Sequence, residues 1–186
     1  MDAMFGLGRG ATARDVMSAP AIACSEDATF EEIARLLADR EISGMPVIDR
    51  HGTVVGVLSE RDVARAWGSP LARLSLAHGT TTGPFLRKLR GVGGSGTRAR
   101  HVMRTPAITA HPDTPVRTVA SIMVKEGVNR LPVVRAGHLV GVVTRGDVLA
   151  YVAGSDHHLP ELEEPPIVVG LDLNDPQDVL LLTKEA

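Results

Sequence analysis

The sequence predicts an α+β fold made of two copies of one β-α-β-β-α unit, and three observations support this. Residues 13–63 align with residues 99–148 with one gap, and 17 of 50 aligned positions are identical. Within each copy, apolar residues follow first a strand period and then a helix period. The 186 residues are 44% hydrophobic and 23% charged, which is typical of a globular chain with a buried core.

The first copy begins with a short apolar extended piece at residues 21–23. A helix follows, because Thr29 and Glu32 have the spacing of a capping box and apolar residues then recur at helical intervals. Two β-branched runs separated by His51-Gly52 predict a hairpin. A second helix is expected at residues 60–66.

The second copy follows the same order, starting with an extended piece at residues 107–109. Thr114 is the expected N-cap of its first helix, with Pro115 in the first turn, where proline is tolerated. The hairpin turn is expected at Ala136-Gly137, and the last helix at residues 145–152. One copy would leave an apolar sheet face poorly covered, so two copies packed face to face are expected to bury both faces.

The repeats divide the chain into five segments. These are an N-terminal segment (1–11), the first repeat (12–67), a Gly-rich basic connection (68–97), the second repeat (98–153) and an acidic C-terminal tail (154–186). Residues 1–154 contain 19 Lys and Arg against 14 Asp and Glu, whereas the remaining residues contain one Lys against eight acids. The tail is therefore distinct from the rest of the chain.

The connection and the tail leave several functions open. The connection is either a flexible linker or a segment that contacts the acidic tail or a polyanion. The apolar runs at residues 167–169 and 179–182 would cover the module, meet a second subunit or engage a partner, and the sequence does not choose among these.

Three short motifs occur in the same order in both copies. They are Val16-Met17, Met45-Pro46-Val47-Ile48 and Gly56-Val57-Leu58-Ser59-Glu60-Arg61-Asp62 in the first copy, and Val102-Met103, Leu131-Pro132-Val133-Val134 and Gly141-Val142-Val143-Thr144-Arg145-Gly146-Asp147 in the second. This arrangement resembles a tandem pair of cystathionine-β-synthase (CBS) domains, the Bateman module. The resemblance implies two repeats packed by pseudo-twofold symmetry, with clefts between them that bind AMP, ADP, ATP or S-adenosylmethionine. It also implies that modules pair into homodimers.

The Ser/Thr-x-x-Asp motifs are the main candidate ligand sites. The resemblance assigns the hydroxyl of Ser59 or Thr144 to a phosphate and the carboxylate of Asp62 or Asp147 to the ribose hydroxyls. A helix start offers unpaired N–H groups to an anion, and Arg61 and Arg145 would add charge-assisted contacts. The same spacing is also a helix-capping pattern. Two matching instances favour a nucleotide role in at least one cleft.

The resemblance places the adenine base near the first extended piece and the segment before the hairpin. The candidate residues are Ile22, Ala23, Met45 and Pro46 in the first repeat, and Ile108, Thr109, Leu131 and Pro132 in the second. Arg130 would pair with a phosphate or with a nearby carboxylate. Gly44 is the residue aligned with Arg130, so the two clefts are not expected to be equivalent.

The function that these observations favour is a non-catalytic, homodimeric regulatory module that senses an adenine nucleotide and signals to an unidentified protein partner. No obligatory cofactor, metal site or catalytic residue is expected, and His157-His158 is interpreted as a solvated loop. The alternatives are a nucleic-acid-associated adaptor that uses the basic connection and, less favoured, a small enzyme acting on nucleotides. Aromatic residues make up only 3% of the chain, which disfavours base stacking.

The expected location is the cytoplasm. Cys24 is the single cysteine and cannot form an internal disulfide, which suits a reducing compartment. The N-terminal segment lacks the apolar core of a signal peptide, and no apolar run is long enough for a membrane span.

Overall fold

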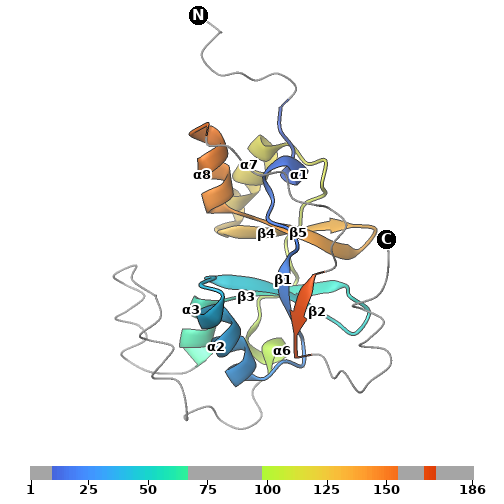
Figure 1. Ribbon diagram of the computed structural model, residues 1–186, viewed down its shortest axis with the longest axis vertical. Helices are drawn as coiled ribbons and strands as arrows, with labels where there is room; N and C mark the ends of the chain where they lie inside the picture. Colours follow the sequence, from blue (N-terminus) through green and yellow to red (C-terminus); the bar gives the residue numbers. More distant parts are fainter. Residues whose placement is uncertain (1–9, 67–97, 155–165, 171–186) are drawn as a thin grey trace, which may run out of the picture. The chain divides into compact units, whose positions relative to one another are not determined.

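The computed structural model describes residues 10–66, 98–154 and 166–170 (Figure 1). The chain forms two compact units, and each is described by itself. The first-repeat unit contains the described residues 22–66, 98–107 and 166–170, and the second-repeat unit contains residues 10–21 and 108–154. The α+β class with two repeats is confirmed, and the pseudo-twofold packing stays a prediction.

The first-repeat unit is built on a sheet of four strands. Its elements are β1 (Ile22–Ser25), α2 (Phe30–Asp39), β2 (Gly44–Ile48), β3 (Val54–Ser59), α3 (Glu60–Ala66), α6 (Ala99–Val102) and β6 (Ile167–Val169). The strand order is β3-β2-β1-β6, in which β2 and β3 are antiparallel and β1 is parallel to both of its neighbours. The helices α2 and α3 lie on the same side of this sheet (Figure 1).

The second-repeat unit has the same plan with a smaller sheet. Its elements are α1 (Ala13–Val16), α7 (Val116–Glu126), β4 (Arg130–Arg135), β5 (His138–Thr144) and α8 (Arg145–Val152). Among the described residues of this unit, the sheet consists of the antiparallel hairpin of β4 and β5. Both predicted hairpins and both predicted second helices are confirmed.

The extended piece predicted at residues 107–109 does not form a strand. Ala110 instead makes a single parallel bridge to Val133, at the position where Cys24 pairs with Val47 in the other unit. The physical difference is the neighbour on the far side. In the first-repeat unit β1 is held between β2 and β6, whereas the described residues of the second-repeat unit supply no strand equivalent to β6.

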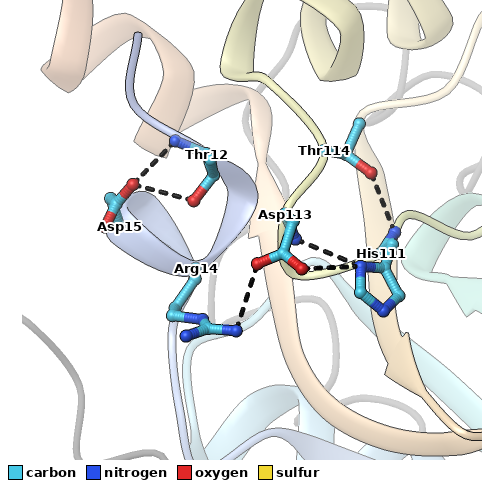
Figure 2. Close-up of polar contacts among 6 residues, drawn as sticks. All are labelled: Thr12, Arg14, Asp15, His111, Asp113 and Thr114. Carbon is cyan, nitrogen blue, oxygen red and sulfur yellow. Dashed lines mark hydrogen bonds and ion pairs between the residues drawn. The ribbon is translucent and has the colours of Figure 1, made fainter. Parts of the chain in front are cut away.

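The capping prediction is confirmed for α2 and wrong for α7. Glu32 Oε2 accepts hydrogen bonds from Thr29 N–H and Oγ1, both at 2.8 Å. The N-cap of α7 is Pro115, which the sequence alignment places opposite Thr29. Thr114 instead accepts a hydrogen bond from the backbone N–H of His111 at 3.0 Å (Figure 2). Its hydroxyl therefore closes the turn before the helix.

Each unit combines the body of one repeat with the first residues of the other repeat. In the second-repeat unit, Ala13 N–H donates to Thr114 O at 2.7 Å, and Arg14 pairs with Asp113 at 3.1 Å (Figure 2). In the first-repeat unit, Ala99 N–H donates to Ala28 O at 2.9 Å in the equivalent register. The compact unit is therefore not one contiguous repeat.

Hydrophobic cores lie between the sheets and the helices of each unit. In the first-repeat unit Ile33, Leu37, Val47 and Leu58 are almost fully buried. In the second-repeat unit Val119, Leu131, Val133 and Val143 are fully buried. Burial of such side chains from opposite elements is the main stabilising term for both units.

Candidate functional site

The Ser59–Asp62 motif lies where β3 ends and α3 begins. Asp62 is only 5% exposed. Its Oδ2 accepts from Ser59 N–H at 3.0 Å and also from the Ser59 hydroxyl. Its other oxygen, Oδ1, accepts from Nε of Arg104 at 3.2 Å. Both carboxylate oxygens of Asp62 are therefore engaged within the unit.

The Thr144–Asp147 motif occupies the same junction between β5 and α8. Asp147 Oδ2 accepts from Thr144 N–H at 2.6 Å and from Thr144 Oγ1 at 2.7 Å. Asp147 N–H in turn donates to Thr144 Oγ1 at 3.3 Å, which completes the capping box. Among residues 10–66, 98–154 and 166–170, no cation contacts Oδ1 of Asp147. Within the described part of the chain, this oxygen can still accept hydrogen bonds.

Capping geometry alone does not mark a ligand site. Thr12 and Asp15 have the same Thr-x-x-Asp spacing, and Asp15 Oδ2 accepts from Thr12 N–H at 2.7 Å and from Thr12 Oγ1 at 2.8 Å (Figure 2). No named strand leads into this box, which starts the four-residue helix α1. The two motifs differ from this box in their place between a strand and a helix. They differ from each other in the second carboxylate oxygen, which accepts from Arg104 in Asp62 alone among the described residues.

The cations named from the sequence are placed differently in the two units. Arg61 and Arg145 are exposed beside their motifs. Arg130 is half-buried and stands opposite Thr144 in the β4–β5 register, so it lies beside the second motif. Gly44 stands opposite Ser59 in the equivalent register of the other unit. The two motif surroundings therefore differ in charge.

Most residues proposed for the base contribute to the cores. Ala23, Met45 and Leu131 have no exposed surface. Two further positions, Pro46 and Pro132, are also buried, while Ile22 and Ile108 are half-buried and Thr109 is exposed. Their role in holding a base stays a prediction.

Sequence reasoning did not identify Arg104, which contacts Asp62. A signal was present in the alignment of the repeats, where Arg104 corresponds to Ser18. Arg104 adds a positive charge to one of two otherwise similar segments. Such a difference indicates that the charged side chain has a partner in its own unit that the other unit lacks.

The structure describes only some of the remaining features of the sequence. Among the described residues no group of three His, Cys, Asp or Glu side chains is arranged to hold a metal ion. Within the same residues no helix is both long enough and apolar enough to cross a membrane. The basic connection, His157-His158 and the run at 179–182 lie outside the described residues. The run at 167–169 forms β6 and covers the edge of β1.

Comparison with known proteins decides the family. The model of the CBS domain matches residues 13–69 and 99–154. The chain belongs to the CBS domain family. An uncharacterised protein of Methanocaldococcus jannaschii is 34% identical over 150 residues, which cover 73% of this chain and 88% of that protein. A second uncharacterised protein of the same organism is 29% identical, and the match spans only 31% of its length.

Solved CBS domain structures have the same fold. The CBS domain pair of protein MJ0100, in complex with 5′-methylthioadenosine and S-adenosyl-L-methionine, is 27% identical with a TM-score of 0.59 and covers 78% of this chain and 98% of that chain. The CBS domain of a membrane protein from Sphaerobacter thermophilus is 32% identical with a TM-score of 0.58, and the match covers 83% of this chain and 91% of that one.

Proposed function

We propose that this CBS chain is a non-catalytic regulatory module that binds an adenine nucleotide or nucleoside and signals to a protein partner. The ligand class comprises AMP, ADP, ATP and S-adenosylmethionine. The binding residues that we propose are Thr144 and Asp147, with Arg145 and Arg130 as the cations for a phosphate.

The observation that carries this proposal is the state of the Asp147 carboxylate together with its place at the junction of β5 and α8. Thr144 fixes Oδ2 with two hydrogen bonds of 2.6 and 2.7 Å, which sets the orientation of the whole group. Oδ1 is then available to accept from the hydroxyls of a ribose diol. A preorganised acceptor loses little side-chain entropy on binding. The structure of the MJ0100 pair with two adenine nucleosides supports the ligand class.

A thermal-shift experiment tests the proposal. Each candidate ligand is added to the purified chain at about 100 times its dissociation constant, where binding adds about 2.7 kcal/mol of stability. For a chain of 186 residues this raises Tm by about 5–10 °C. Asp147→Asn is expected to lose the shift. The one remaining side-chain oxygen is needed to accept from Thr144, so the amide nitrogen takes the place of Oδ1, and it cannot accept a hydrogen bond from the ribose.

The matched control is Asp15→Asn. It weakens a capping box of the same geometry in the same unit, so it controls for the loss of a cap. This control is expected to keep the ligand-induced shift while lowering the starting Tm. The proposal is contradicted if no ligand of the panel stabilises the chain, or if both variants lose the shift equally.

We also propose that the module is a homodimer located in the cytoplasm. Val124 on α7 and both Leu149 and Val152 on α8 are exposed apolar side chains, with exposures of 84%, 59% and 64%. The two helices contact each other within the second-repeat unit. A second copy of the chain that packs on these helices would bury the exposed apolar side chains. The free thiol of Cys24 suits a reducing compartment.

A further inference from the structure

Arg104 forms an ion pair with the aspartate of only one motif. Its Nε lies 3.2 Å from Asp62 Oδ1, and the Asp62 side chain is 4% exposed while that of Arg104 is 49% exposed. The remaining carboxylate oxygen is occupied by Ser59. A buried carboxylate with both oxygens engaged offers poor acceptors to a ribose diol unless the cation moves away.

The backbone places Ser18 in the second-repeat unit where Arg104 stands in the first-repeat unit. Arg104 N–H donates to Val57 O at 2.9 Å, and Val57 N–H donates to Arg104 O at 3.0 Å. Ser18 N–H donates to Val142 O at 2.9 Å, and Val142 N–H donates to Ser18 O at 3.1 Å. In both units the motif aspartate follows the paired valine by five residues. The side chain at this position therefore starts from the same place relative to each aspartate.

We propose that this position decides which motif accepts a ribose. Arg104 closes the Ser59–Asp62 motif, and Ser18 leaves the Thr144–Asp147 motif open, so that each chain binds one adenine nucleoside through Asp147. Arg104 is then a specificity-determining residue that acts by occupying Asp62. This inference rests on the proposed function, because it concerns the same ligand class.

Reciprocal substitutions followed by calorimetric titration with S-adenosylmethionine test the inference. The wild-type chain is expected to bind one ligand. Arg104→Ser frees Asp62 and is expected to raise the stoichiometry to two per chain. Ser18→Arg places a guanidinium beside Asp147 and is expected to weaken binding by at least about tenfold, which is the effect of losing one charge-assisted hydrogen bond.

Arg100→Ser is the matched control. Arg100 lies in the same short segment, has a similar exposure of 43%, and pairs with Asp27 instead of a motif residue. This variant is expected to bind one ligand per chain. The inference is overturned if the wild-type chain binds two ligands, if Arg104→Ser still binds one, or if Ser18→Arg binds as tightly as the wild type.

A ligand-free measurement separates failure of this inference from failure of the proposed function. If no nucleotide binds to the wild type, the proposed function fails, and the closing contact is then measured by thermal unfolding of Arg104→Ser, Asp62→Asn and the double variant. A double variant that loses less Tm than the two single losses together supports the closing ion pair. Additive losses overturn it.

Discussion

Gly170→Ala is expected to detach β6 from the sheet of the first-repeat unit. Gly170 follows β6 and has a φ of +82°, in the region that L-residues rarely adopt. A Cβ at this position would lie 2.5 Å from Cβ and 2.7 Å from Cα of Ala28. Ala28 is fully buried, and its N–H donates to Ser25 O at 3.0 Å, so it has little freedom to shift.

The cost has two parts. The left-handed backbone costs a non-glycine residue about 1–2 kcal/mol, and the overlap with Ala28 adds about 1–3 kcal/mol, as in an overpacked core. The expected total is about 2–5 kcal/mol. Detachment of β6 would relieve this strain, so the measured loss of stability is limited by the free energy that β6 contributes.

Gly154→Ala is the control that isolates the overlap. Gly154 has a similar φ of +70°, but nothing lies within 4 Å of an added Cβ. Urea unfolding gives the stability of both variants, and hydrogen exchange reports the backbone of β1. Gly170→Ala is expected to lose more stability and to exchange at least about tenfold faster in β1, since 1.4 kcal/mol corresponds to a factor of ten. Equal effects of the two variants would refute the reasoning.

Three further predictions follow from the cores and the exposed helix surface. Ala13→Asp is expected to increase hydrogen exchange in α7, β4 and β5 but not in the first-repeat unit, because Ala13 is fully buried in the second-repeat unit. Ala99→Asp should increase hydrogen exchange in the first-repeat unit alone, because Ala99 is fully buried there. The reverse pattern would contradict the packing of each repeat with the first residues of the other. Burial, with a smaller contribution from the charge of Glu32, raises the pKa of Cys24 to about 12. The unfolded thiol titrates near pH 8.5, so the contribution of the neutral Cys24 thiol to folding stability is complete below that pH and is lost as the pH rises towards 12. Iodoacetamide should label Cys24 at pH 8 only after unfolding. Rapid labelling of the folded chain would be inconsistent with a buried thiol. The double variant Leu149→Glu with Val152→Glu is expected to convert the proposed dimer to a monomer in sedimentation velocity. Arg117→Glu changes an exposed polar position on α7 and should leave the dimer intact. An unchanged sedimentation coefficient in the double variant would rule out this interface.

The repeat and its local patterns were sufficient to predict most secondary structure. Glu60–Ala66 and Arg145–Val152 are helices as expected, because strand and helix periods change sharply at Ser59 and Thr144. The cap of α7 was misplaced by one residue, since both Thr114 and Pro115 suit a helix start and only the turn with His111 distinguishes them.

Long-range packing was less accessible from the sequence. The docking of residues 12–19 beside the second repeat depends on backbone hydrogen bonds to Pro112, Thr114 and Val142, which no local pattern encodes. β6 is a run of three apolar residues, and the sequence does not indicate which element it packs against. The structure shows that it pairs with β1. The contact of Arg104 with Asp62 joins residues 42 positions apart and has the same origin.

A crystal structure of this chain grown with S-adenosylmethionine tests the central claim most directly. The account predicts that ribose hydroxyls lie within about 3 Å of Asp147 Oδ1, with Asp62 still paired to Arg104. A ligand whose ribose binds away from Asp147, or a crystal grown at saturating concentration without bound ligand, would contradict the account.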